Sequence, residues 1–185
     1  MPAGAWERGP ATTLPPARTE GSYTVALVCL GNICRSPMAH VVVEERLADL
    51  GLGAPVGPVT VVSSGTGGWH VGDPMDPRAA ATLGAAGYDA TRHRARQHDA
   101  TAAVDLVLAM DSSNRADLAD LGTDAARLAL FGDLDPLTPG ADVPDPYYGG
   151  EQGFADVLAM VERTADALVA RLTAERPWLP AGSTG

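Results

Sequence analysis

The residues with the clearest chemical potential lie in the octapeptide CLGNICRS at residues 29–36. It sets Cys29 and Arg35 on either side of a glycine–asparagine turn, with five residues between them. An apolar, β-type run at residues 23–28 precedes it, and Pro37 behind it opens a helical pattern. A strand, a tight loop and a helix N-terminus in this order bring backbone N–H groups together where the helix dipole adds positive potential. The segment therefore predicts a cradle for a phosphate-like anion.

Cys29 and Arg35 supply what such a cradle needs for catalysis. Positive potential at its mouth favours the thiolate of Cys29, which is the nucleophilic form of the side chain. The guanidinium of Arg35 is a planar fork that fits two phosphate oxygens. The pattern C-x5-R also arises by chance, from a buried cysteine and a nearby surface arginine, but the turn before Arg35 and the Ser-Pro pair after it favour catalysis. We therefore expect phosphate-ester hydrolysis through a phosphocysteine, with a phosphate-binding loop made of Leu30, Gly31, Asn32, Ile33, Cys34 and Arg35.

The leaving-group oxygen needs a proton donor, and Asp145 in the segment VPDPYYGG at residues 143–150 is the best candidate. Two flanking prolines stiffen its backbone, and Tyr147 and Tyr148 are suited to hold an aryl leaving group beside the acid. The alternative is that Asp145 is only a turn residue, which is common for aspartate before proline. Three more aspartates compete within the same loop: Asp133, Asp135 and Asp142. The adjacent tyrosines favour Asp145.

Local patterns predict four strands that alternate with four helices. The strands are expected at 23–28, 58–62, 104–109 and 127–131, and the helices at 37–50, 77–86, 112–121 and 153–175. This alternation predicts an α/β fold of three layers, α/β/α, with a four-stranded parallel sheet and the phosphate-binding loop between the first strand and the first helix. The site is then expected beyond the carboxyl ends of the strands. Trp69 follows the second strand at the same end, either as a second pocket wall or packed beneath its glycine-rich loop.

Length and charge set broad limits on the protein. The 185 residues, 45% of them hydrophobic, suit one domain with a substantial core, expected at residues 23–176. Residues 1–22 are expected to form a disordered tail, and residues 177–185 a flexible one. The net charge of −10 argues against a nucleic-acid partner and against anionic membranes. No stretch approaches the ~20 apolar residues of a membrane span.

The two cysteines, Cys29 and Cys34, both lie in the loop, so no disulfide framework crosses the fold and a reducing, cytoplasmic location is expected. Residues 1–22 lack the apolar segment of a signal peptide, which leaves only unconventional export open. The four histidines lack metal-ligand spacing, and Arg35 with the loop amides neutralises phosphate, so neither a metal nor a cofactor is expected. The oligomeric state stays open, with a monomer favoured.

Several segments together resemble the low-molecular-weight protein tyrosine phosphatase family. Besides the octapeptide, the resemblance rests on SSGT at 63–66, WHVGDPMDPR at 69–78, HRARQ at 93–97, AMDSSN at 109–114 and DPYY at 145–148. It extends from about residue 23 to the last helix. It implies that the substrate is a phosphotyrosine-containing protein, that Cys29 is the nucleophile, and that Asp145 is the general acid and later the base for water.

The resemblance also implies supporting roles around the loop. Ser36 stabilises the Cys29 thiolate by a hydrogen bond. The side chain of Asn32 bonds to Ser63 and His93 and keeps the loop open, and asparagine tolerates the left-handed backbone that such a loop needs. Without the resemblance, His93 would be taken as an ordinary surface histidine in an arginine-rich stretch.

Two positions invite more specific expectations. His40 stands where the family often carries a carboxylate that supports the network histidine, so we expect His93 to be less readily protonated here than in relatives. Cys34 is either a small buried residue or the partner of Cys29 in a reversible disulfide that protects the nucleophile from overoxidation. The resemblance favours this redox role.

Three other functions compete with phosphotyrosine hydrolysis. A thiol-dependent arsenate reductase on the same fold needs cysteines outside the loop, and the sequence has none. A protein-arginine phosphatase resembles this loop but carries threonine in the place of Ile33, and the paired tyrosines also favour phosphotyrosine. A non-catalytic phosphate-binding module would lack the nucleophile or the acid. The sequence thus predicts a phosphatase that acts on phosphotyrosine and on small aryl phosphates.

Overall fold

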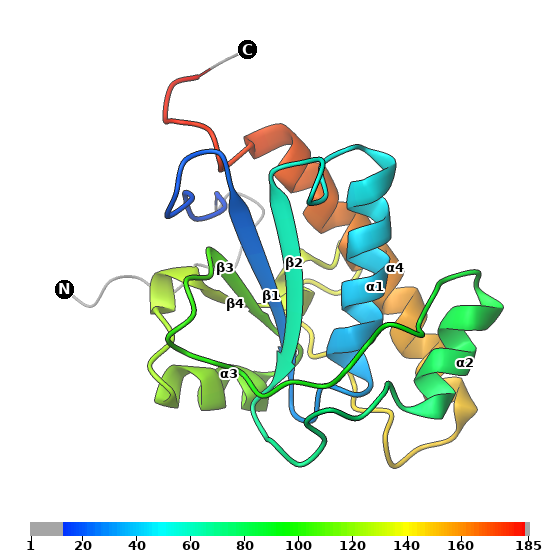
Figure 1. Ribbon diagram of the computed structural model, residues 1–185. Coiled ribbons are helices and arrows are strands. Elements are labelled where there is room, and N and C mark those ends of the chain that lie inside the picture. Colours follow the sequence, from blue (N-terminus) through cyan, green and yellow to red (C-terminus); the bar gives the residue numbers. More distant parts are fainter. Residues whose placement is uncertain (1–12, 184–185) are drawn as a thin grey trace.

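The computed structural model describes residues 13–183 of the chain. In chain order the elements are β1 (Tyr23–Cys29), α1 (Arg35–Asp49), β2 (Val59–Gly65), α2 (Pro77–Ala85), β3 (Leu106–Ala109), α3 (Ser112–Asp120), η1 (Ala125–Arg127), β4 (Leu128–Leu130), η2 (Phe131–Leu134) and α4 (Glu151–Glu175), as Figure 1 shows. The two η elements are short 3-10 turns on either side of β4. The predicted alternation of strands and helices is confirmed.

The four strands form one parallel sheet in the order β2-β1-β3-β4. From β1 the chain crosses to β2 on one side and then returns to β3 on the other, so the winding reverses between β1 and β3. The loops that leave these two strands diverge at their carboxyl ends, which is where open parallel sheets form their binding crevices. Cys29 ends β1 and Asp111 follows β3, so both residues stand at this crevice.

The sheet divides the core into two parts of unequal size. Tyr23, Val25 and Leu27 of β1 point into the larger part, together with α1, α2 and α4. Ala26 and Val28 alternate with them and point into the smaller part, which α3 covers. Figure 1 shows α1, α2 and α4 on one side of the sheet and α3 on the other. The predicted three-layer α/β/α arrangement is therefore confirmed.

Side-chain caps fix where two of the helices begin. The Asp76 carboxylate accepts from the Arg78 backbone N–H at 2.8 Å and starts α2, with Pro77 at the first helical position. The Asp111 carboxylate accepts from the Asn114 backbone N–H at 2.7 Å and starts α3. Each cap lies just beyond the carboxyl end of the sheet, so it brings a charged side chain to the crevice.

Residues 13–22 correct the expectation of a disordered tail that reaches Ser22. The side chain of Leu14 is buried, and the Arg18 backbone N–H donates to the buried Asp105 carboxylate at 2.6 Å. The composition of this segment disfavours regular secondary structure, but an apolar anchor and a buried carboxylate that needs donors still order it. Residues 1–12 lie outside the described residues.

The segment after α4 is also ordered over much of its length. Trp178 is buried in the larger core, and its carbonyl accepts from the Gly21 backbone N–H at 2.8 Å. The predicted flexible segment 177–185 is therefore wrong for its first residues, because a buried indole fixes them. Residues 184–185 are not described. Among the helices of residues 13–183, none is long and apolar enough to cross a membrane.

Candidate active site

One asparagine, Asn32, holds the loop between β1 and α1 in place by hydrogen bonds. Asn32 is fully buried and adopts φ +55°, a left-handed conformation that asparagine tolerates better than most residues. Its side-chain amide donates to Ser36 Oγ at 2.9 Å, and its side-chain oxygen accepts from the Arg96 backbone N–H at 2.9 Å. The turn of the loop is therefore tied both to the start of α1 and to a distant segment of chain.

Two donors converge on the sulfur of Cys29. The Asn32 backbone N–H lies 3.3 Å from Cys29 Sγ, and the Ser36 hydroxyl oxygen lies 3.0 Å from it. Because Ser36 Oγ already accepts from the Asn32 amide, its own proton is available to the sulfur. The carbonyl of Ser64 is a second acceptor for that proton at 3.3 Å. Ser36 therefore lies where its predicted role places it, within hydrogen-bonding distance of the sulfur.

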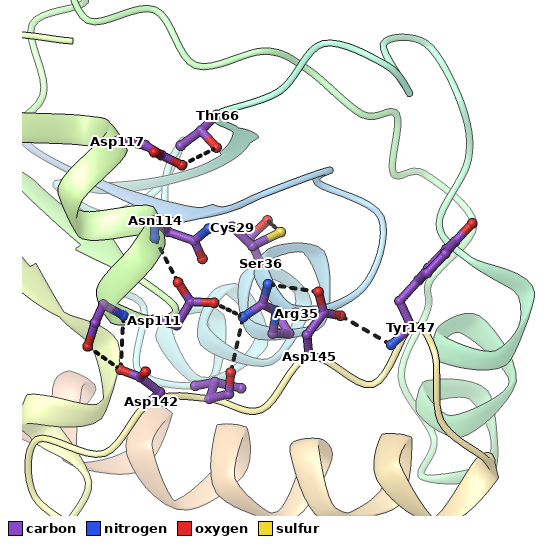
Figure 2. A network of polar contacts seen from close by, with 12 residues as sticks. Cys29, Arg35, Ser36, Thr66, Asp111, Asn114, Asp117, Asp142, Asp145 and Tyr147 are labelled. Atoms are coloured by element: carbon purple, nitrogen blue, oxygen red, sulfur yellow. Dashed lines mark hydrogen bonds and ion pairs between the residues drawn. The ribbon is translucent and has the colours of Figure 1, made fainter. Parts of the chain in front are cut away.

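Arg35 is held by two carboxylates at the floor of the site, as Figure 2 shows. Its Nη1 donates to Asp111 Oδ2 at 2.5 Å and to the Val143 carbonyl at 3.1 Å, and its Nη2 donates to Asp145 Oδ2 at 3.3 Å. Burial alone would lower the pKa of Arg35, but the hydrogen bond to Asp111 and the nearby Cys29 and Asp145 raise it. A buried, permanent cation therefore lies beside the sulfur.

Asp111 has a role that the sequence analysis missed. Its Oδ1 caps α3 while its Oδ2 accepts from Arg35, so one carboxylate fixes both. Its position immediately after β3, at the same sheet edge as Cys29, is a signal that sequence reasoning had available. The carboxylate holds one arm of the guanidinium and leaves the other arm directed toward the pocket.

Asp145 is the aspartate of its loop that faces the pocket. Its Oδ1 accepts from the Tyr147 backbone N–H at 3.1 Å, and its Oδ2 faces Arg35. The carboxylate is 39% exposed, so a substrate can reach it.

The three competing aspartates are occupied elsewhere. Asp133 accepts from the Leu130 backbone N–H at 3.0 Å, and Asp142 accepts from the backbone N–H and hydroxyl of Ser112. Asp135 is paired with Arg163 by two bonds of 2.8 Å each. The geometry thus favours Asp145 over its competitors.

The pocket above Cys29 encloses about 300 Å³ and has mainly aromatic and aliphatic walls. Its lining residues are Cys29, Leu30, Gly31, Ile33, Cys34, Arg35, Trp69, His70, Asp145, Tyr147 and Tyr148. Tyr147 is 38% exposed and meets Tyr148 edge to face, with ring centroids 4.9 Å apart. Trp69 is 74% exposed, so it is a pocket wall and does not pack beneath its loop. All three predicted wall residues line the pocket.

The supporting network differs from the expected one. Ser63 does not reach the Asn32 side chain; its hydroxyl lies 3.1 Å from His40 Nδ1, because this strand residue points toward α1. His93 contacts the backbone of Asn32 instead of its side chain, with Nε2 donating to the carbonyl at 2.7 Å. The side-chain amide is satisfied by Ser36 and Arg96. His93 therefore supports the loop through a partner other than the predicted one, whereas Ser63 contacts α1 and not the loop.

The histidines beside the loop are disfavoured as cations. Burial lowers the pKa of His93, and Arg94 and Arg96 lower it further against the opposing hydrogen bond to Asn32. The main cause is burial and not His40, so the expected difference between His93 here and in relatives stays a prediction. Burial also lowers the pKa of His40, with Glu44 opposing and His93 adding to the effect.

Cys34 is a buried free thiol on the wall of the pocket. Burial raises its pKa to about 12, and the neighbouring Asp76, Cys29 and Asp145 add to the shift. Cys29 is also free. The two thiols share one loop, but their environments differ: Cys29 faces converging donors, whereas Cys34 is kept neutral.

Comparison with known proteins finds similar chains and similar folds among phosphatases. The family described as low molecular weight phosphotyrosine protein phosphatase matches residues 24–177. A low molecular weight protein-tyrosine-phosphatase of Streptomyces coelicolor is 45% identical over 156 residues, which cover 80% of this chain and 93% of the relative. Low molecular weight protein-tyrosine phosphatase A of Mycobacterium tuberculosis is 44% identical over 147 residues, covering 78% and 88%. The crystal structure of a protein tyrosine phosphatase from Entamoeba histolytica, with Hepes in its active site, is 30% identical with a TM-score of 0.77, covering 84% and 99%.

Proposed function

Because the chain belongs to the low-molecular-weight phosphotyrosine protein phosphatase family, we propose that it hydrolyses phosphotyrosine in proteins, and small aryl phosphates, through a phosphocysteine on Cys29. One observation carries the proposal. A single pocket with aromatic walls holds the Cys29 sulfur, the Arg35 guanidinium and the Asp145 carboxylate, which are the nucleophile, the cation and the acid that the reaction needs.

In the first step, the Cys29 thiolate attacks phosphorus, and the bond between phosphorus and the phenolic oxygen breaks. Asp145, in its protonated form, gives its proton to the departing phenolate. Arg35 and the loop N–H groups hold the equatorial oxygens. Because Asp111 and the Val143 carbonyl hold Nη1, the Nη2 arm exchanges its 3.3 Å contact with Asp145 for a phosphate oxygen without losing its orientation.

In the second step, water attacks the phosphocysteine. Asp145, now a carboxylate, takes a proton from that water, and the bond between sulfur and phosphorus breaks. The electron pair returns to Cys29 as a thiolate, which the Asn32 N–H and the Ser36 hydroxyl receive at 3.3 and 3.0 Å. Inorganic phosphate leaves, and the enzyme is restored. The reaction proceeds by ping-pong chemistry.

The walls support an aryl phosphate over the alternative substrates. Tyr147, Tyr148 and Trp69 offer aromatic surface at the place where the leaving group would lie. Ile33 also lines the pocket, where a protein-arginine phosphatase would carry threonine. A cytoplasmic location is part of the proposal, because both cysteines belong to the catalytic loop and the nucleophile acts as a free thiolate.

Cys34 supports a redox function in the proposal. Peroxide converts the Cys29 thiolate to a sulfenic acid, which condenses with the Cys34 thiol to a disulfide and water. Thiol reductant then restores both thiols. Peroxide-treated wild type should regain activity with reductant, whereas Cys34→Ala should not. Equal recovery of the two proteins would remove this role.

The deciding experiment compares hydrolysis of an aryl phosphate and of matched phosphotyrosine, phosphoserine and phosphoarginine peptides. Phosphotyrosine turnover should vanish in Cys29→Ser, and Asp145→Ala should lower kcat/KM about 10²-fold or more. A preference for phosphoarginine would keep the nucleophile and overturn the substrate class. Absence of turnover on all four would indicate a phosphate-binding module.

A further inference from the structure

The segment WHVGDPMDPR ends in a charged pair that the mechanism above does not use. The backbone N–H of Asp76 donates to the carbonyl of Ile33 in the phosphate-binding loop at 2.9 Å. The buried Asp76 carboxylate accepts from Arg78 through Nε at 3.1 Å and through Nη2 at 2.9 Å. Arg78 is therefore anchored, through one aspartate, to the loop that holds the nucleophile.

The other side of the Arg78 guanidinium faces the loop that carries the acid. Its central carbon lies 5.5 Å from the ring centroid of Tyr147 and 4.7 Å from that of Phe154, which are cation–π distances. Its Nη1 lies 3.5 Å from the Gly149 carbonyl. A planar guanidinium can make an in-plane pair and a stacked contact at the same time, which a lysine cannot do.

These contacts lead directly to the carboxylate of the acid. The Tyr147 ring rests on Arg78, and the Tyr147 backbone N–H donates to Asp145 Oδ1 at 3.1 Å. The preceding part of the acid loop is fixed separately, since the Val143 backbone N–H donates to the Met110 carbonyl at 2.8 Å. The Asp145 carboxylate thus lies between an anchor on Met110, which directly follows β3, and a second anchor on Arg78.

We propose that Arg78 is a positioning residue for proton transfer: it fixes the acid loop against the phosphate-binding loop so that Asp145 reaches the leaving-group oxygen. The proposal rests on the proposed function. Its consequence is selective. Removal of Arg78 should impair reactions that depend on the acid and leave phosphate capture by Arg35 largely intact.

The test measures kcat/KM of Arg78→Gln and Arg78→Lys on two aryl phosphates. Phenyl phosphate has a poor leaving group and depends on the acid, whereas 4-nitrophenyl phosphate has a good one and depends on it less. For Arg78→Gln we expect a loss of about tenfold on phenyl phosphate and under about threefold on 4-nitrophenyl phosphate. Arg78→Lys should show the same selectivity with a smaller loss, because it keeps the charge but lacks the planar fork.

The matched control is Arg46→Gln. Arg46 makes the same kinds of contact far from the pocket, with Nε 2.9 Å from Asp166 and its guanidinium 5.8 Å from the Tyr88 ring centroid. Its loss should leave both rates unchanged. A double-mutant cycle adds a readout that a merely structural role would not give: in the Asp145→Ala background, Arg78→Gln should cost less than about twofold.

Three outcomes would overturn the proposal. They are equal losses on the two substrates, an undiminished loss in the Asp145→Ala background, and wild-type rates in Arg78→Gln. Thermal unfolding of each variant identifies a folding defect. If Arg78→Gln has such a defect, the proposal is judged from Arg78→Lys, by whether its loss is larger on phenyl phosphate than on 4-nitrophenyl phosphate. If Asp145→Ala itself lost kcat/KM equally on both substrates, the assignment of Asp145 as the acid would fail instead. Failure of the proposed function can therefore be distinguished from failure of the Arg78 proposal.

Discussion

Two arginine–aspartate clusters in this molecule use the same groups for different ends. In the pair of Arg163 and Asp135, which joins α4 to the residue that follows η2, both carboxylate oxygens accept bonds of 2.8 Å from one guanidinium. The same carboxylate also accepts from the Leu137 N–H at 2.9 Å and the Thr138 hydroxyl at 2.7 Å. Every acceptor site of this buried group is in use, so the pair is closed.

The cluster around Arg35 is open by comparison. Its contact with Asp111 is short, but its contact with Asp145 is 3.3 Å long and made to a carboxylate that is 39% exposed. One arm of the guanidinium is fixed, and the other lies where an incoming anion can take it. The closed pair satisfies all its partners, whereas the open cluster keeps a donor that can exchange its partner, as the proposed function requires.

Exchanging each arginine for lysine should separate the two clusters most strongly. Arg35→Lys should lower kcat/KM about 10³-fold, because lysine cannot bond to Asp111 and two phosphate oxygens in one plane. Arg163→Lys should change kcat/KM by less than about threefold and lower the thermal midpoint instead. Steady-state kinetics and thermal unfolding of both variants check this. The difference between the two clusters would be contradicted if Arg163→Lys lowered kcat/KM as much as Arg35→Lys does.

Removal of the Asp135 carboxylate should lower the stability of the protein and leave its kinetics unchanged. Asp135→Ala leaves Arg163 without its partner and should lower the free energy of unfolding by about 3 kcal/mol. At a temperature where the variant is still folded, its KM for an aryl phosphate should equal that of wild type. Urea unfolding and steady-state kinetics measure the two quantities. A raised KM in the folded variant would show that the pair also shapes the site.

A substitution of Asp111 tests how far its bond to Nη1 of Arg35 matters for the reaction. Asp111→Asn keeps a good helix cap for α3 but replaces the charge that faces Arg35. We expect kcat/KM to fall about tenfold with little loss of stability, because a neutral amide orients the guanidinium less strongly. Asp142→Asn, at the neighbouring contact with Ser112, is the control. A loss of stability in Asp111→Asn, without a loss of rate, would make Asp111 only a cap.

The smallest expected effect is a pH dependence of stability. The pKa of Asp135 lies below its ordinary value: burial opposes this shift, but the bonds from Arg163, Leu137 and Thr138 outweigh it. Its stabilisation is therefore complete above the unfolded pKa of about 4 and is lost as the pH falls below it. Between pH 7 and pH 3, the free energy of unfolding should fall less steeply with pH in Asp135→Asn than in wild type. If the free energy of unfolding fell equally with pH in both proteins, the lowered pKa of Asp135 would be contradicted.

The loop between β1 and α1 and the fold could be predicted because their signals are local. The apolar run before Cys29 and the proline after Ser36 specify a strand, a loop and a helix in sequence order. Asp145 was the best of four aspartates only because of its neighbours. The competitors were excluded by partners far away in the chain, such as Arg163, which no local pattern shows.

Other features depended on contacts that sequence spacing does not reveal. Ser63 and Ser64 stand on opposite faces of β2, and their partners come from distant segments: His40 of α1 for Ser63, and His98 of the chain between α2 and β3 for Ser64. The order of residues 13–22 depends on the buried carboxylate of Asp105, which lies about 90 residues away along the chain. Composition indicated a lack of regular structure there, and this was not the same as disorder.

The ordered segments at both ends of the described chain have a practical consequence. The Ala17 N–H donates to the Pro177 carbonyl at 3.0 Å, which ties the two ends together at the amino end of β1. Cys29 stands at the other end of this seven-residue strand, about 20 Å away. A tether, affinity handle or surface linkage joined through either of these segments would leave the pocket facing open solution. Immobilised enzyme should therefore accept bulky phosphoprotein substrates as readily as the enzyme in free solution.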